Sequence, residues 1–274
     1  MPELPEVESV CRYLECIIIG KKIDRVQVYC PKIIQNCAVE SFTQKLQGQV
    51  FQAIRRRGKY LIFECSDYIL LSHLRMEGKY LFHPRREIKK HEHVVFQMAD
   101  MDLIYQDTRK FGTMHLFSKT VDVLTIPPLS LMGPEPFAEE LTASYLYDAL
   151  KNKKQAIKAS LLEQKIICGL GNIYVDEVLF DAKIHPGQAG NTLSLDNLQE
   201  LISSIQKIIA RAIELGGTTI RSFTVHHDIH GRFQNELQIH SQDKCPVCKQ
   251  QVKRMRIAGR TTYYCAVCQS VDKK

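Results

Sequence analysis

The sequence begins Met1-Pro2-Glu3-Leu4-Pro5-Glu6-Val7-Glu8, a stretch with two prolines and three glutamates. A chain start is commonly a frayed tail, but Pro5 suits the first turn of a helix because it has no N–H group to leave unpaired. Apolar residues then recur at helical spacing, as Val7, Val10, Cys11, Leu14, Ile17 and Ile18. The pattern predicts a core helix that ends at Gly20 and holds Pro2 and Glu3 in place.

A fixed proline at position 2 suggests nucleophilic chemistry. A small second residue permits removal of Met1, which would leave a secondary amine with a pKa of roughly 8. Such an amine attacks an aldehyde carbon to give a cationic iminium, an electron sink for elimination, and Glu3 beside it would move protons. If Met1 is retained, this chemistry is blocked. The alternative is that these residues only start a helix, with acidic side chains favouring its dipole.

Length and composition indicate a globular protein. The 274 residues, 45% hydrophobic and 24% charged, suffice for one large domain or for two ordinary ones plus a small module. No apolar run approaches the length of a membrane span, and glutamates stand where a signal peptide has basic residues. Six of the ten cysteines are scattered singly, which is typical of a reducing compartment. We therefore expect a cytoplasmic protein with no membrane partner.

The net charge lies at the C-terminal end of the chain. From Lys244 to Lys274, eight basic residues face one acidic residue, so this segment carries the whole formal charge of +7. A basic segment on a neutral body points to a polyanion such as nucleic acid. The alternative is a tail that only improves solubility.

The first half of the chain contains many short segments of strand character. We expect strands at 26–30, 50–54, 60–64, 68–74, 79–83, 94–98, 103–106 and 113–117. Short strands with tight turns and no intervening helices predict an antiparallel sandwich or barrel. Arg75-Met76-Glu77-Gly78 is interpreted as a hairpin connection between two of these strands.

Prolines and glycines between residues 127 and 136 predict a domain boundary. Beyond it we expect helices at 142–151, 154–163, 175–182 and 194–215. The turn Gly169-Leu170-Gly171-Asn172 exposes backbone N–H groups at the start of a helix and can bind a phosphate, although a plain helix cap has the same sequence. Residues 218–233 are expected to form a mobile loop.

Four cysteines form the strongest motif. The pairs Cys245-x2-Cys248 and Cys265-x2-Cys268 are sixteen residues apart, a spacing that gives four thiolates for a tetrahedral zinc ion. With no open coordination position, one structural Zn2+ is expected; a redox pair is the alternative. Arg260, at the presumed tip of a hairpin between the pairs, suits contact with a phosphate.

Together, the Pro-Glu-Leu-Pro-Glu start, the Gly-Leu-Gly-Asn-Ile-Tyr turn and the four-cysteine hairpin with Ala-Gly-Arg resemble the bacterial formamidopyrimidine-DNA glycosylases over the whole chain. The resemblance implies an α+β multidomain fold: an N-terminal β-sandwich with its helix at 1–130, a helix–two-turn–helix domain at 131–236 and a zinc finger at 237–274. It also implies a monomer acting on damaged double-stranded DNA, which excises oxidised purines such as 8-oxoguanine and then nicks the strand as an abasic-site lyase.

The resemblance assigns catalytic roles to four residues. Pro2 resembles the nucleophile that attacks the sugar C1′ and forms the Schiff base, and Glu3 resembles its acid/base. Lys59 resembles the lysine of β-elimination, and Arg260 the finger arginine of δ-elimination. Without the resemblance, Lys59 would be only a charge at the start of a strand.

The resemblance also implies two groups of DNA-binding residues. His73, His91, Lys154 and Asn172 match positions that contact the DNA backbone. Met76, Arg109 and Phe111 match side chains that fill the space left by a flipped nucleotide, with Arg109 facing the orphaned cytosine. Otherwise, ordinary core packing is the simpler interpretation of Met76 and Phe111.

Two other functions stay open at this point. The endonuclease VIII branch shares the fold but favours oxidised pyrimidines; Leu4 and the Arg109/Phe111 pair argue against it. A non-catalytic zinc-finger DNA binder is the alternative outside the enzymes. The chain also departs from the family pattern at His240, where a phosphate-binding tyrosine is frequent.

Overall fold

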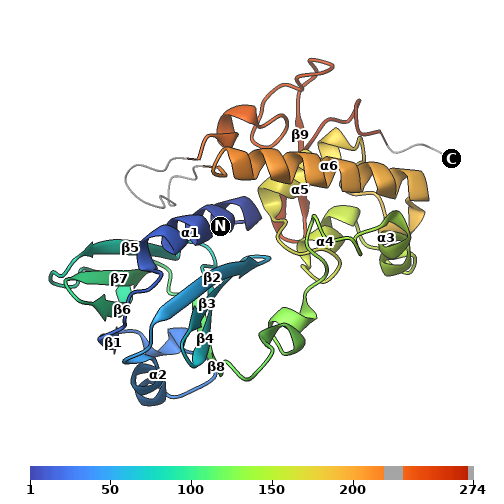
Figure 1. The fold of residues 1–274 in the computed structure, drawn as a ribbon. Helices are drawn as coiled ribbons and strands as arrows, with labels where there is room; N and C mark the ends of the chain where they lie inside the picture. The colour runs from blue at the N-terminus through green and yellow to red at the C-terminus, as the bar shows by residue number, and fades with distance from the viewer. Residues whose placement is uncertain (219–230, 271–274) are drawn as a thin grey trace. The chain divides into compact units, whose positions relative to one another are not determined.

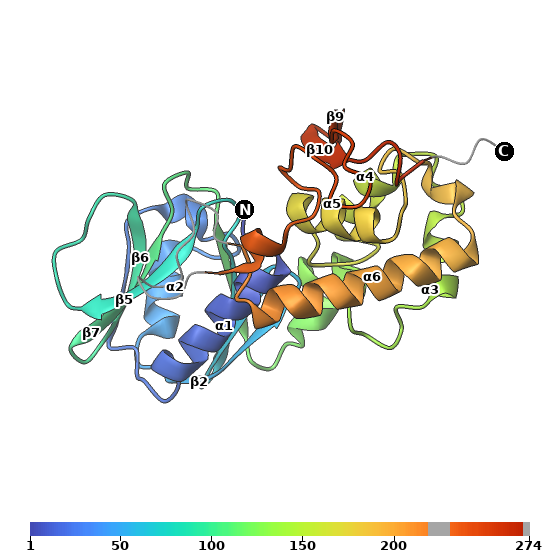
Figure 2. The same cartoon turned by 90° about the horizontal axis from the view of Figure 1, so that it is seen from above.

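The computed structural model describes residues 1–218 and 231–270. Its contacts divide the chain into two compact units, the first formed by residues 1–130 with 216–231 and the second by residues 131–215 with 232–274 (Figures 1 and 2). The division into domains at 1–130, 131–236 and 237–274 stays a prediction. Most of the expected loop at 218–233 lies outside the described residues.

Two four-stranded antiparallel sheets build the first unit. One has the order β2 (Phe51–Arg57), β3 (Tyr60–Cys65), β4 (Tyr68–His73) and β8 (Thr113–Ser118). The other has the order β1 (Arg25–Val28), β6 (Glu92–Met98), β7 (Met101–Gln106) and β5 (Lys79–Pro84). Their buried side chains form one core, where the ring of Phe51 lies 5.9 Å from Phe63 in its own sheet and 6.3 Å from Phe96 in the other. The predicted sandwich is confirmed.

The hairpin expected at Arg75-Met76-Glu77-Gly78 does not form, so that prediction was wrong. β4 pairs with β3 and β8, whereas β5 pairs with β7 in the opposite sheet. The alternation of apolar residues specifies which face of a strand is buried, but it does not specify the partner strand. The segment is therefore a crossover between the two sheets.

The first helix, α1 (Leu4–Ile18), agrees with the sequence pattern. Pro5 lies in its first turn, and Val7, Val10, Leu14 and Ile18 are buried in the core of the two sheets. The helix contacts β2. A second short helix, α2 (Val39–Leu46), was not expected. It buries only Phe42 and Leu46, which is too short a repeat to be recognised as helical.

The described residues of the second unit form four α-helices and a hairpin: α3 (Ala143–Leu150), α4 (Ile157–Leu162), α5 (Asn172–Asp181), α6 (Leu195–Glu214), β9 (Lys253–Ile257) and β10 (Arg260–Tyr264). The helix expected from Lys154 starts only at Ile157, because Ala156 forms a bridge with Ala189 and the Ile157 N–H donates to the Gln188 carbonyl. Among the described residues, no helix has the length and apolarity needed to cross a membrane.

Candidate functional site

The N-terminal residues are held by a small network around the Glu6 carboxylate. Pro2 and Glu3 are buried, Glu3 with 2% of its surface exposed. The Glu3 N–H donates to Glu6 Oε2 at 2.8 Å. Glu6 Oε1 accepts from the N–H of Thr218 at 2.7 Å and from its hydroxyl at 3.0 Å. The terminus is therefore fixed in place, as the sequence predicts, and Glu6 supplies the acceptors that hold it.

Lys59 and His73 lie together on the sheet of β2, β3, β4 and β8. Lys59 follows Gly58 in the β2–β3 turn and is 5% exposed, while His73 pairs with Tyr60 across the β3–β4 ladder. Burial first, and then the nearby charges of Arg75 and Lys59, lower the pKa of His73 to about 3. Its Nδ1 accepts from the Arg75 N–H at 2.9 Å, so the ring proton is on Nε2. At neutral pH, His73 is a neutral donor.

The loop that carries Arg109 and Phe111 is organised by a buried carboxylate that the sequence analysis missed. Asp107 Oδ1 accepts from the Arg109 N–H at 3.0 Å, and Oδ2 accepts from the N–H groups of Phe111 and Gly112, both at 2.8 Å. The Tyr105 hydroxyl donates to Oδ2 at 3.3 Å. The sequence shows only a single aspartate in a turn, and nothing in it indicates that the side chain accepts hydrogen bonds from four donors.

Met76, Arg109 and Phe111, the candidates to fill the space left by a flipped nucleotide, are called the wedge residues here. All three are exposed and not buried in the core. Met76 is 39% exposed and Phe111 is 49% exposed, and the Arg109 guanidinium lies 4.8 Å from the centre of the Phe111 ring. Core packing therefore does not explain Met76 or Phe111. The two segments that carry them are close in space, because glycines in both, Gly78 and Gly112, pack directly against the hydroxyl of Tyr105.

His91 adjoins the same loop. It has a left-handed φ of 72°, and its carbonyl accepts from the Asp107 N–H at 2.9 Å. The next histidine in the chain, His93, uses Nε2 to contact the Asp107 carbonyl at 2.8 Å. The structure thus brings His91 to the base of the Arg109 loop.

The remaining candidates belong to the second unit. Asn172 is the first residue of α5, and its Nδ2 donates to the Thr261 carbonyl at 3.0 Å. Arg260 is exposed at the start of β10, after a tight turn in which Ala258 and Gly259 both have positive φ. Lys154 is exposed just before α4. The structure therefore places Asn172 beside the hairpin of Arg260.

The four cysteines converge on one point. Their sulfur atoms all lie within 4.8 Å of one another, with Cys245–Cys268 at 3.8 Å and Cys248–Cys265 at 3.4 Å. Four thiolates at about 2.3 Å from a tetrahedral zinc ion are separated by about 3.8 Å. Donor set and spacing fit one structural zinc ion, as the sequence predicts.

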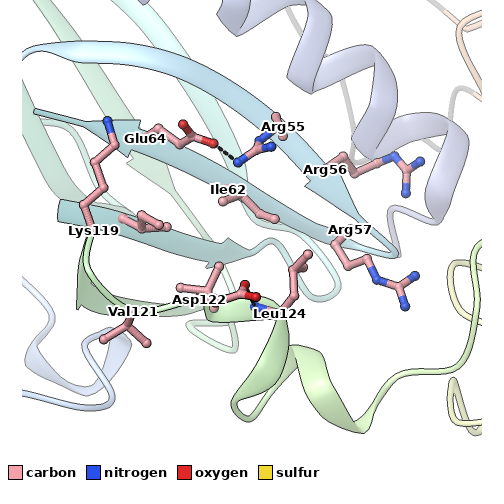
Figure 3. Close-up of a pocket in the computed structure, with 11 residues that line it drawn as sticks. Arg55, Arg56, Arg57, Ile62, Glu64, Lys119, Val121, Asp122 and Leu124 are labelled. Atoms are coloured by element: carbon pink, nitrogen blue, oxygen red, sulfur yellow. Dashed lines mark hydrogen bonds and ion pairs between the residues drawn. The ribbon is translucent and has the colours of Figure 1, made fainter.

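A separate cavity of about 370 Å3 lies on the outer face of the sheet of β2, β3, β4 and β8 (Figure 3). Its lining includes Arg55, which is ion-paired with Glu64, together with Lys119 and the apolar side chains of the segment from Val121 to Leu124. No candidate residue lines it, so the cavity does not belong to the candidate site.

Comparison with known proteins settles the family. Formamidopyrimidine-DNA glycosylase of Bacillus subtilis is 44% identical over 275 residues, covering 98% of this chain and 99% of that protein. The chain belongs to the formamidopyrimidine-DNA glycosylase family. The enzyme of the same name from Shouchella clausii is 45% identical with the same coverage.

The domains and the solved structures of this family agree with that assignment. Residues 1–114 match the formamidopyrimidine-DNA glycosylase N-terminal domain, residues 132–224 its H2TH domain, and residues 242–271 the zinc finger found in FPG and IleRS. Wild-type Lactococcus lactis Fpg bound to DNA containing N7-benzyl-Fapy-dG is 42% identical, with a TM-score of 0.91 over 98% of this chain and 100% of that one. The same protein bound to abasic-site DNA superposes with the same TM-score, identity and coverage. The expected α+β fold is confirmed.

Proposed function

We propose that this protein is a bifunctional DNA repair enzyme that excises oxidised purines, such as 8-oxoguanine and formamidopyrimidines, from duplex DNA and then cleaves the strand at the abasic site. The observation that carries the proposal is the fixed N-terminus, a buried Pro2 followed by a buried Glu3 and anchored by Glu6 and Thr218. A relative from Lactococcus lactis has been solved with DNA that contains N7-benzyl-Fapy-dG and with abasic-site DNA.

In the proposed reaction, the Pro2 amine exposed by removal of Met1 attacks the sugar C1′. The C1′–base bond breaks, the sugar ring opens, and a cationic iminium links the proline nitrogen to C1′. Glu3 transfers the protons that base departure and ring opening require. The iminium then accepts the electrons released when the 2′ proton is removed, and the 3′ phosphate leaves. We assign Lys59 to this β-elimination and Arg260 to the δ-elimination that follows.

The exposed side chains of Met76, Arg109 and Phe111 would enter the DNA double helix where the damaged nucleotide leaves it. Taking a base out of the stack costs a few kcal/mol, and apolar side chains that occupy the gap offset that cost. Met76 and Phe111 would fill the gap, with Arg109 donating to the orphaned cytosine. His73, His91, Lys154 and Asn172 would bind the DNA backbone, and bound zinc would keep the hairpin of Arg260 rigid. We infer that the protein acts as a monomer in the cytoplasm.

Borohydride trapping tests the mechanism. Reduction of the iminium should join the Met1-processed protein covalently to damaged DNA, whereas Pro2→Gly, at equal duplex affinity, should lose most strand scission. Mass spectrometry of the native N-terminus serves as the control, since retained Met1 blocks the amine. Binding without trapping by the processed protein would instead indicate a non-catalytic DNA binder.

A choice of lesions tests the substrate class. Excision should be faster from duplexes with 8-oxoguanine opposite cytosine than from duplexes with thymine glycol. The reverse preference would place the protein with the endonuclease VIII type, the alternative for oxidised pyrimidines.

A further inference from the structure

A buried carboxylate in the second unit contacts three different elements. Asp176 on α5 is 1% exposed, and its Oδ1 pairs with the Lys158 ammonium on α4 at 2.6 Å. Its Oδ2 lies 2.7 Å from His240 Nδ1 and accepts from the Tyr263 N–H of β10 at 3.2 Å. Lys158 is itself fully buried. None of these contacts has been given a role in the reaction proposed above.

Two hydrogen bonds between α5 and β10 form because the spacing of their side chains along the helix is close to the spacing of their partners along the strand. Asn172 and Asp176 are four residues apart on α5, a rise of about 6 Å. Their partners Thr261 and Tyr263 are two residues apart on β10, a rise of about 6.7 Å. Asn172 donates to the Thr261 carbonyl and Asp176 accepts from the Tyr263 N–H. Helix α5 therefore hydrogen-bonds to one edge of β10, as a third strand of the sheet would, while β9 pairs with the other edge.

Further contacts fix the segments that the Asp176 carboxylate joins. The His240 ring packs edge-to-face on the Tyr263 ring at 4.9 Å, and the Arg254 guanidinium lies 5.3 Å from the centre of the same ring. The adjacent carboxylate, Glu177, accepts from the N–H groups of Gln238, Ile239 and His240 at 2.8–3.0 Å. Glu177 thus anchors the chain before the zinc site, and Asp176 anchors the strand that begins with Arg260.

We propose that Asp176 is a positioning residue: held by Lys158 and His240, its carboxylate sets the register of β10 on α5 and thereby aims Arg260 at the DNA phosphate. The proposal rests on the proposed function, because its consequence is expressed through Arg260. If β10 shifted by one residue along α5, every side chain on the strand would point to the opposite face, and Arg260 at the tip of the hairpin would change direction.

The decisive variant replaces the buried pair by apolar residues, Asp176→Leu with Lys158→Met. Exchanging a buried ion pair for apolar side chains preserves a fold, whereas removing one partner leaves a buried charge. The matched control is Asp181→Leu with Lys207→Met, which removes an ion pair of 2.7 Å between the last residue of α5 and α6, with the Asp181 side chain 30% exposed and the Lys207 side chain 69% exposed. Both proteins should retain one zinc ion per chain.

The first readout is hydrogen exchange at the Tyr263 amide, which does not depend on activity. Exchange should accelerate on the order of tenfold or more in the variant and stay unchanged in the control. The second readout is the ratio of δ- to β-elimination products on abasic DNA. It should fall about as far as in Arg260→Ala, and adding Arg260→Ala to the variant should change it no further.

Unchanged Tyr263 exchange, or an unchanged product ratio with zinc retained, would overturn the proposal. If the double variant does not fold, His240→Phe should shift both readouts in the same direction by less, and His240→Asn, whose Nδ2 can replace the Nδ1 donor, should restore Tyr263 protection; no shift in His240→Phe contradicts the proposal. A wild-type protein that traps no DNA would defeat the proposed function, while the exchange measurement would still test the register.

Discussion

Burial decides the chemistry of single residues in this protein. His73 could be a cation by its residue type, yet its position between Tyr60, Arg75 and Lys59 keeps it neutral, and the Arg75 N–H selects its tautomer. Glu6 could be one more acidic residue at the start of a helix, yet it is the acceptor that ties Glu3 to Thr218. In both cases the surroundings, and not the side chain alone, set the role.

His73 should make stability depend on pH. Its folded pKa, about 3, is lowered from 6.5, so its contribution is fully present above pH 6.5 and is lost as the pH falls towards 3. His73→Asn can still accept from the Arg75 N–H but cannot titrate. Between pH 7 and pH 5, the free energy of unfolding of the wild type should therefore fall by up to about 2 kcal/mol more than that of the variant. Denaturant titration at both pH values measures this, and parallel losses would contradict it.

Glu6→Gln should loosen the N-terminus. The Glu6 carboxylate now accepts from Glu3 on one oxygen and from Thr218 on the other. The amide of the variant would point an N–H group at one of these donors, which should cost about 1–3 kcal/mol of stability. The rate of borohydride trapping should fall because the Pro2 amine is less well positioned. Glu15→Gln, at an exposed position on the same helix, is the control for the loss of one charge. Equal trapping rates in the two variants would show that Glu6 does not position the terminus.

At the scale of elements, the segment that carries Met76 and the segment that carries Phe111 both pack against Tyr105. Tyr105 on β7 is fully buried, and its hydroxyl meets Asp107 on one side and the backbones at Gly78 and Gly112 on the other. Met76 and Phe111 are thus carried by segments that meet at the same hydroxyl. A change on one segment should therefore affect the other.

Gly112→Ala tests this coupling. A Cβ at position 112 would overlap the Tyr105 hydroxyl and ring, and such overpacking costs about 1–3 kcal/mol. Excision of an intact damaged base should slow by roughly tenfold or more, about 1.4 kcal/mol in the barrier, because it needs the wedge. Trapping on a preformed abasic site should slow much less. Gly48→Ala, which strains a backbone with φ of 86° but brings its Cβ within 4 Å of no other atom, controls for destabilisation away from Tyr105. An equal effect on both substrates in Gly112→Ala would argue against a wedge role.

At the scale of the whole molecule, the positive charge and the zinc site lie in the same part of the sequence. The basic residues from Lys244 onward account for the entire formal charge, and the four cysteines bring those around the hairpin into one folded module. Folding of the hairpin should thus determine how much of this charge acts together on DNA.

Cys265→Ser should weaken DNA binding through unfolding of the hairpin. Cys265 is fully buried, and loss of a thiolate removes metal-coupled folding free energy. We expect the Kd for duplex DNA to rise about tenfold or more at physiological salt, and the slope of log K against log salt to fall by about 0.9 for each lost phosphate contact. Fluorescence anisotropy at several salt concentrations measures both, with zinc content as the check on the variant. Unchanged affinity at physiological salt would contradict the prediction.

The sequence by itself determined the features that local spacing encodes. The period of apolar residues located α1 and α6, alternation located the strands, and the spacing of the cysteines specified zinc, because each signal is carried by neighbours along the chain. Only the tertiary structure decided which strands pair, as the segment from Arg75 to Gly78 shows by crossing between sheets. It also revealed the buried carboxylates of Asp107 and Asp176, whose partners come from distant parts of the sequence. A hydrogen-bond acceptor acquires its role from the donors that folding brings to it, and no local pattern records them.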